Sequence, residues 1–232
     1  MRFPQARLLI FAKTPTPGRV KTRLAGRLGP IGAAKLYQRL LRRTLHIASG
    51  SSLCPVQLWC APDTRHGFFQ RCRRVYGIGL RRQQGSDLGQ RMHHALNTAL
   101  RQAPYAVLIG GDCPSVGEAE LQAALMALAA GHDAVLGPAA DGGYVLIGLR
   151  RSDRTLFRRV AWGSSAVLAA TRRRLRRAGL DWVELPPGWD VDRPADLRRL
   201  HRQFPDLTAS AFKAGTVVMV PAPGKQTPGI KQ

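Results

Sequence analysis

The sequence has little of what secreted, membrane-spanning or zinc-binding proteins need. No stretch approaches the ~20 apolar residues of a membrane span. The apolar run at 8–12 is too short for a signal peptide, and Lys13 follows it without a cleavage site. The chain has only four cysteines, and none of them has the C-x-x-C spacing or the histidine pair of a zinc site. We therefore expect a soluble, cytoplasmic protein with reduced thiols.

Acidic and aromatic residues are also scarce. There are 14 Asp and Glu against 36 Lys and Arg, a net charge of +22, and aromatic residues make up 6% of the chain. Such a positive surplus attracts polyanions and speeds the association of anionic ligands. The few aromatics are not interleaved with the arginines as a single-strand nucleic-acid platform requires. A nucleic-acid-binding module is therefore the least favoured of three interpretations, and no specific nucleic-acid partner is expected.

Length and hydrophobic patterning indicate one α/β domain. At 232 residues with 44% hydrophobic side chains, the chain is long enough for a single buried core. Apolar strands alternate with helical patterns, which predicts a mostly parallel sheet covered on both faces. We expect strands near 8–12, 56–61, 77–80, 105–109, 134–136, 145–149 and 182–185, and helices near 30–49, 64–75, 87–100, 118–130, 164–177 and 195–201. The domain is expected to span 1–205, with 206–232 as an extension whose end, from Pro221, is disordered.

A basic loop follows the first expected strand. Prolines and Gly18 keep this loop out of helix, and it carries four cations, Lys13, Arg19, Lys21 and Arg23. Open α/β sheets bind ligands in the crevice outside their strand ends. Arginine offers a planar fork to phosphate oxygens and lysine a compact charge, so the loop suits an anionic ligand. It matches neither the Walker loop nor the dinucleotide glycine motif. The alternative is a solvated basic loop in a generally basic protein.

Asp112 is the first acidic candidate. It follows an apolar strand and two glycines, which places it at the carboxyl end of a central strand beside the basic loop. A carboxylate next to a phosphate-binding loop is a natural ligand for Mg²⁺ or Mn²⁺, which proteins hold through one or two carboxylates plus substrate phosphates. The alternative is a helix N-cap before Pro114.

Asp190 and Asp192 form a second acidic pair just before a helix. Two carboxylates two residues apart, after a strand, could supply further ligands to the same ion. Asp192 is equally explained as an N-cap with Pro194 in the first helical turn. Asp190 precedes that cap and has no local helix to serve.

Three further motifs admit both a functional and a structural interpretation. Two glycines in the run from Asp141 to Tyr144 let the backbone approach a ligand closely, although Asp-Gly is also a common turn. Ser86 or Asp87 is expected to cap a helix after a glycine turn. Trp162 could line a pocket, or its segment could cap the next helix.

These motifs together resemble a known bacterial family. The signature Lys13-x-Pro15-x-Pro17-Gly18-Arg19-Val20-Lys21-Thr22-Arg23-Leu24 is followed by D-L-G-x-R-M at 87–92, G-D-C-P at 111–114, D-G-G-Y at 141–144, W-G-x-S at 162–165 and D-V-D-x-P-x-D-L at 190–197. The chain resembles, over about 5–205, the glycosyltransferases of the nucleotide-diphospho-sugar transferase superfamily that were once classed as a domain of unknown function. Some members are named for arsenosugar biosynthesis and others as transferases associated with radical-SAM and selenium-related genes. The guanylyltransferases of molybdenum-cofactor and coenzyme F420 synthesis are more distantly similar.

The resemblance implies a fold and a set of roles. The fold is the three-layer α/β/α, Rossmann-like GT-A fold with a mostly parallel central sheet. The resemblance implies that Lys21 and Arg23 meet nucleotide phosphates, and that Asp112 and Asp190 hold the metal. It places Gln84, Gly85 and Asp87 near the base or ribose, and Asp141, Gly142, Gly143 and Tyr144 near the acceptor. To these the residues themselves add Lys13, Gly18 and Arg19 of the basic loop, Asp192 of the acidic pair and Trp162 as a pocket wall. Arg193 stands where the family usually has threonine, which puts the local helix cap in question.

The leading functional hypothesis is a metal-dependent glycosyltransferase. It would use Mg²⁺ or Mn²⁺ and a nucleotide-diphospho-sugar, and Asp141 would orient or deprotonate the hydroxyl of a small-molecule acceptor. The alternative enzyme is a nucleotidylyltransferase of the guanylyltransferase type, in which a substrate phosphate attacks a nucleoside triphosphate and pyrophosphate leaves. The same cations and aspartates would serve both reactions, so the sequence leaves the two open, together with the base, the sugar, the acceptor and the oligomeric state.

Overall fold

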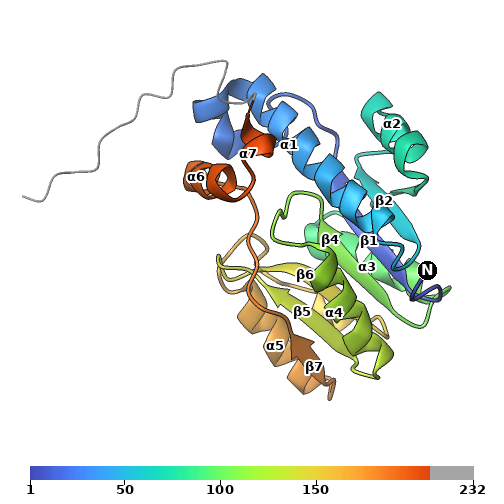
Figure 1. The fold of residues 1–232 in the computed structure, drawn as a ribbon. Helices are drawn as coiled ribbons and strands as arrows, with labels where there is room; N and C mark the ends of the chain where they lie inside the picture. The colour runs from blue at the N-terminus through green and yellow to red at the C-terminus, as the bar shows by residue number, and fades with distance from the viewer. Residues whose placement is uncertain (210–232) are drawn as a thin grey trace, which may run out of the picture.

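The computed structural model describes residues 1–209 and contains one seven-stranded sheet, so the predicted disordered end from Pro221 lies outside the described residues. The strands are β1 (Arg7–Lys13), β2 (Val56–Ala61), β3 (Gly79–Arg82), β4 (Ala106–Gly110), β5 (Ala134–Pro138), β6 (Tyr144–Leu149) and β7 (Trp182–Glu184). Their order is β3-β2-β1-β4-β6-β5-β7, and in the described part β6 alone runs antiparallel to its neighbours (Figure 1). The predicted mostly parallel sheet is therefore confirmed.

Helices cover both faces of this sheet, as the alternating pattern predicts. The α-helices are α1 (Ala25–Gly50), α2 (Gly67–Tyr76), α3 (Leu88–Leu100), α4 (Glu118–Ala129), α5 (Val167–Arg177), α6 (Pro194–Gln203) and α7 (Pro205–Thr208). Leu8 and Ile10 of β1 pack in one core cluster with α1, α2 and α4, whereas Leu9 packs on the opposite face with α3 and α5. Side chains alternate between faces along a strand, so one apolar run supplies both layers of the core. The three-layer α/β/α architecture is thus confirmed (Figure 1).

The register of the central strands brings the basic loop and Asp112 to one edge of the sheet. β1 lies between β2 and β4 and runs parallel to both, with Phe11 opposite Gly110 and Lys13 opposite Ala61. The N–H of Gly111 donates to the carbonyl of Phe11 at 3.0 Å, just beyond the end of the ladder. Parallel strands end at the same edge, so the segments that follow β1 and β4 leave the sheet side by side.

The first half of α1 forms a separate cluster with the end of the described chain. α1 joins two helices across a kink at Gly29, whose φ of +66° is not helical, so its longer segment begins at Pro30, as expected, and a short turn from Ala25 precedes it. The buried residues of the cluster are Leu24, Ala33, Leu36 and Leu40 on one side and Trp189, Val191, Leu197 and Leu200 on the other. This packing carries the segment 189–192 back to the basic loop, over the top of the sheet (Figure 1).

Three expected helix starts differ from the structure, and each difference is local. The N-cap of α2 is His66, whose Nδ1 accepts the N–H of Phe68, rather than Thr64. α5 begins at Val167, after the expected Ser164 or Ser165. The N-cap of α6 is Arg193 rather than Asp192, which corrects that alternative for Asp192.

Gly148 provides a test of the core packing. A Cβ at this position of β6 would lie 2.5 Å from Val135 Cγ1 and 2.8 Å from Leu128 Cδ1. We expect Gly148→Ala to lower the free energy of unfolding by about 1–3 kcal/mol, because overpacking displaces buried neighbours. Chemical denaturation measures this change. Gly50→Ala, which meets nothing within 4 Å, is the control and should shift stability by no more than ~0.5 kcal/mol; equal effects would contradict the packing described here.

Candidate functional site

A cavity of about 730 Å³ lies at the carboxyl ends of β1 and β4 and collects residues from every predicted motif. The predicted site residues that line it are Lys13, Arg19, Lys21, Arg23, Asp87, Asp112, Asp141, Gly143, Tyr144, Trp162, Asp190 and Asp192. Gly18, Gln84 and Gly85 line an adjoining hollow of about 1300 Å³, which shares Lys13 and Arg19 with the cavity. Gly142 lines neither of the two, and its role is to shape the loop beside them.

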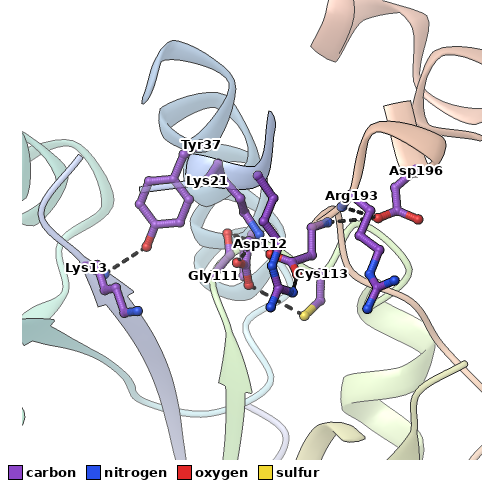
Figure 2. Close-up of polar contacts among 11 residues, drawn as sticks. Lys13, Lys21, Tyr37, Gly111, Asp112, Cys113, Arg193 and Asp196 are labelled. Carbon is purple, nitrogen blue, oxygen red and sulfur yellow. Dashed lines mark hydrogen bonds and ion pairs between the residues drawn. The ribbon is translucent and has the colours of Figure 1, made fainter. Parts of the chain in front are cut away.

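The centre of the cavity is an ion pair between Lys21 and Asp112. Lys21 Nζ lies 2.6 Å from Asp112 Oδ2, and the two side chains are 6% and 27% exposed (Figure 2). Burial opposes both charges, but each partner outweighs it: the ammonium keeps the pKa of Asp112 below its ordinary value, and the carboxylate keeps the pKa of Lys21 above its own. No helix begins until Glu118, so the N-cap interpretation of Asp112 is wrong.

Local structure around Lys21 turns its side chain inward. Lys21 has a left-handed backbone, with φ of 48°, and precedes the short 3₁₀ helix Thr22–Leu24. Val20 is buried against Ala34 and Tyr37 of α1, and Leu24 is buried in the cluster shared with α6. Because its two apolar neighbours are anchored on either side, Lys21 is directed at Asp112 rather than into solvent.

Arg23 forms the second cation–acid pair, with Asp192, nearer the rim of the cavity. The side chains of this pair are 62% and 38% exposed, so the pair adds little to stability. The backbone N–H groups of Asp192 and Arg193 both donate to Asp196 Oδ2, at 3.0 and 2.6 Å (Figure 2). The family's threonine is therefore not needed to hold this turn, since Arg193 contributes through its N–H and Asp196 supplies the acceptor.

Asp190 carries the strongest sign of electrostatic crowding among the carboxylates of the site. Burial and the adjacent Asp112 carboxylate raise the pKa of Asp190 to about 6, Asp141 and Asp192 add to the shift, and Lys21 offsets part of it. Its segment is tied to that of Asp112 through the backbone. The N–H of Val191 donates to the Asp112 carbonyl at 3.3 Å, and the Ser115 hydroxyl bridges the N–H and carbonyl of Trp189 at 2.8 Å each.

The Asp141 loop forms a further wall of the cavity. Asp141 Oδ1 accepts the N–H of Gly143 at 2.9 Å, which fixes the turn. Gly142 has φ of +88°, and a Cβ on it would lie 2.2 Å from the Ser165 carbonyl oxygen. The Gly142 carbonyl accepts the N–H of Leu168 at 2.9 Å. Glycine is therefore required here by the close approach of the segment before α5.

Two aromatic side chains complete the apolar part of the cavity. The rings of Tyr144 and Trp162 are perpendicular, with centroids 6.5 Å apart. Trp162 also covers the first turn of α3, where a Cβ on Gly89 would lie 2.6 Å from Trp162 Nε1. Asp87 caps this helix by accepting the N–H of Gln90 at 2.8 Å, which is the structural role expected for it. The face of an aromatic ring suits the flat face of a base or a sugar ring.

Two buried polar residues of the site were not identified from the sequence. The Tyr37 hydroxyl accepts the N–H of Lys13 at 2.8 Å, and burial raises its pKa further above the ordinary value (Figure 2). Gln83 Nε2 donates to the carbonyls of Ala12 and Trp59 at 3.1 and 2.7 Å, which braces the ends of β1 and β2. Tyr37 lies on the apolar stripe of α1. The signal in the sequence was its hydroxyl, because a buried tyrosine hydroxyl usually has a hydrogen-bond partner.

The acidic residues fit a metal ion that is shared with a ligand. In residues 1–209 no group of three or more His, Cys, Asp or Glu side chains is placed to hold an ion by itself. Asp112 and Asp190 line one cavity, and the Asp112 carboxylate helps to raise the pKa of Asp190. Mg²⁺ typically takes one or two carboxylates and completes its shell with waters and substrate phosphates. The donor set therefore fits Mg²⁺ or Mn²⁺ only when phosphate oxygens are added.

Comparison with known proteins gives the family. A family described as an uncharacterized protein conserved in bacteria (DUF2064) matches residues 44–164, just over half of the chain. The chain belongs to this family. The crystal structure of a Desulfovibrio desulfuricans protein, provisionally named a nucleotide-diphospho-sugar transferase, is 32% identical over 92% of both chains, with a TM-score of 0.78. The resemblance seen in the sequence motifs is thereby confirmed.

More distant structures share the fold alone. A cytidylyltransferase from Leptospira borgpetersenii is 18% identical, with 92% of this chain and 99% of that one covered and a TM-score of 0.57. The 4-diphosphocytidyl-2C-methyl-D-erythritol synthase of Anaerococcus prevotii is 11% identical, with coverage of 87% and 99% and the same TM-score. No curated protein matches the sequence. Among residues 1–209, none of the helices has both the length and the apolar character to cross a membrane.

The raised pKa of Asp190 makes a prediction about stability and pH. A carboxyl whose pKa is higher in the folded state contributes stability that is complete below its unfolded pKa, about 3.8, and lost as the pH rises through about 6. We expect Asp190→Asn to raise the free energy of unfolding by about 1–2 kcal/mol at pH 8, an amount discounted for the partial exposure of the group, and by less at pH 4.5.

Urea denaturation at the two pH values measures this difference. Asp206→Asn, at an exposed acid of α7, is the control and should leave stability nearly unchanged at both. If Asp190→Asn were destabilising at pH 8, the crowding of carboxylates described here would be wrong.

Proposed function

We propose that the protein is a metal-dependent transferase that takes a nucleotide-diphospho-sugar as donor and passes the sugar to a small acceptor. The observation that carries this proposal is the meeting of Lys21, Asp112 and Asp190 in one cavity at the strand ends. The 32% identical structure, provisionally named a nucleotide-diphospho-sugar transferase, supports the choice of donor.

The cations of the basic loop would bind the diphosphate of the donor. Lys21 offers a buried ammonium, and Arg23 offers a planar guanidinium at the rim. Negative charge builds on the diphosphate as the sugar leaves, so cations already fixed beside it stabilise the transition state more than the ground state. Lys13 and Arg19 extend the positive surface toward the adjoining hollow, where the remainder of the nucleotide would lie.

Asp112 and Asp190 would hold the divalent ion against the same diphosphate. When bound, Mg²⁺ or Mn²⁺ supplies Lewis-acid neutralisation of the phosphate oxygens. The two carboxylates are positioned by the hydrogen bond between Val191 and the Asp112 carbonyl. Asp192, paired with Arg23, would act at the edge of this group rather than at its centre.

The acceptor would bind beside Asp141 and the aromatic wall. Asp141 Oδ1 is engaged by Gly143, and in the described chain Oδ2 has no protein partner. That oxygen is available to orient the acceptor hydroxyl or to take its proton. Tyr144 and Trp162 would exclude water from one side of the reacting centre, which slows hydrolysis of the donor relative to transfer of its sugar.

Nucleotidyl transfer is the second candidate, and the adjoining hollow is the observation that favours it. This hollow is lined by Arg65 and Arg82 in addition to Lys13, Arg19 and Arg91, which it shares with the cavity, and Asp63 is the acid among its described lining residues. A basic extension of the cavity would accommodate a nucleoside triphosphate as readily as a nucleotide sugar. Release of pyrophosphate, rather than of a nucleoside diphosphate, distinguishes this reaction from sugar transfer.

We also propose a cytoplasmic location, which the cysteines support. Cys54, Cys60, Cys72 and Cys113 are buried and free of disulfides. Disulfides are rare in the reducing cytoplasm and frequent in secreted domains, so four unpaired thiols suit the former.

Calorimetry with a panel of UDP-, GDP- and CDP-sugars, with and without Mn²⁺, tests the proposed function. We expect at least one donor to bind in a metal-dependent manner, and Asp112→Asn to weaken that binding by at least about tenfold because a charged ligand is removed. Asp181→Asn, at an acid paired with His132 before β7, is the control and should bind as the wild type does.

The product identifies the reaction. A nucleoside diphosphate released with a sugar donor supports glycosyl transfer, and pyrophosphate released from a triphosphate supports the second candidate. If no nucleotide binds with or without Mn²⁺, the proposed function is wrong.

A further inference from the structure

The ammonium of Lys21 is already bound to one carboxylate oxygen of Asp112, a candidate metal ligand. Its Nζ is 2.6 Å from Asp112 Oδ2, and only 6% of the side chain is exposed. Asp190, Asp141 and Asp192 line the same cavity, so Lys21 supplies the buried positive charge in a group of four carboxylates. The ammonium therefore supplies to these carboxylates the positive charge that a bound metal ion would supply.

Entry of a divalent ion beside this ammonium is opposed by charge. An ion held by the Asp112 carboxylate would be repelled by the ammonium already bound to that carboxylate, because like charges repel more strongly as they approach each other. The described residues offer no three-residue group that could compensate with further ligands. A metal ion can therefore replace the Lys21 ammonium at Asp112 only if another anion becomes the partner of the ammonium.

We infer that Lys21 makes the acid site selective for a metal ion that arrives together with a diphosphate. This inference rests on the proposed function and names its ligand class: a diphosphate group, with two phosphates joined, rather than a free metal or an unphosphorylated sugar. The diphosphate gives Lys21 a new partner and gives the ion its missing oxygen ligands at the same time. The four-carbon stem of lysine allows this change of partner without movement of the anchored Val20 and Leu24.

Arg23 repeats the arrangement at the rim. It is paired with Asp192, and it lies two residues after Lys21 on the same segment. A diphosphate that draws Lys21 from Asp112 would also meet Arg23, so both cations change from carboxylate to phosphate partners. Two such exchanges would make metal and diphosphate affinities strongly interdependent, and linkage requires that each raises the other by the same factor.

Mn²⁺ binding to the full chain, followed by electron paramagnetic resonance, tests this inference. The probes are Mn²⁺ alone and Mn²⁺ with inorganic pyrophosphate, with the protein-free Mn²⁺–pyrophosphate complex measured as reference. In the wild type we expect pyrophosphate to raise Mn²⁺ affinity by at least tenfold. In Lys21→Met we expect Mn²⁺ alone to bind about tenfold more tightly and the gain from pyrophosphate to fall by a similar factor.

Lys35→Met is the matched control, because Lys35 is an exposed lysine of α1 that lines neither cavity and has no acidic partner among residues 1–209. It should change the affinity for Mn²⁺ alone by less than about threefold. Circular dichroism verifies folding. Should Lys21→Met unfold, Lys21→Gln retains a donor for Asp112 and should show the same direction of change. Nitrogen-15 NMR of the lysine ammonium groups gives a readout in the wild type: the Lys21 signal should shift with Mg²⁺ and pyrophosphate together and stay in place with Mg²⁺ alone.

Three results would overturn the inference. They are tight binding of Mn²⁺ alone to the wild type, an unchanged or lower Mn²⁺ affinity in Lys21→Met or Lys21→Gln, and an equal gain in Lys35→Met. In each case metal-dependent binding of a nucleotide sugar would still support the proposed function. If the wild type bound neither pyrophosphate nor any nucleotide at any Mn²⁺ concentration, the proposed function and this inference would both fail.

Discussion

The contact on which the site depends is the buried pair of Lys21 and Asp112. Two charges can leave water together only if each neutralises the other, because the desolvation penalty of a lone buried ion is several kcal/mol. The pair therefore joins the loop after β1 to the segment after β4. The apolar packing of these two segments comes from their neighbours, Val20 and Leu24 beside Lys21 and Gly111 beside Asp112. Loss of one partner would leave the other without compensation at the floor of the cavity, so the two positions act as one unit.

Sheet topology explains why this pair can form between segments so distant along the chain. β1 and β4 are parallel neighbours paired up to Gly110, the end of β4, and the Gly111 N–H continues the ladder by one bond to Phe11. A Cβ on Gly111 would lie 2.6 Å from Leu41 Cδ1, so the turn leading to Asp112 is pressed closely against α1. The same helix supplies Tyr37 to the end of β1. One helix thus positions both strand ends that contribute to the site.

The third acidic segment reaches the site by a different route. Asp190 follows β7, at the edge of the sheet, and returns over the strand ends because Trp189, Val191 and Leu200 pack on the first half of α1. The hydrogen bonds from Val191 to Asp112 and between Ser115 and Trp189 then fix the Asp190 segment against the segment after β4. The crowding that raises the pKa of Asp190 is the cost of this convergence, and a bound cation would relieve it.

The sequence by itself determined the strands, most helices and the loops that bear the site, because apolar periodicity, proline and glycine act locally. It identified Lys21, Asp112 and Asp190 as candidates, but it misplaced the caps at Thr64 and Asp192, since several nearby residues can cap a helix and packing selects one. Only the tertiary structure decided that Lys21 pairs with Asp112 and Arg23 with Asp192, and that Tyr37 belongs to the site. These partners are separated along the chain, and strand order, register and the packing of α1 on α6 bring them within reach.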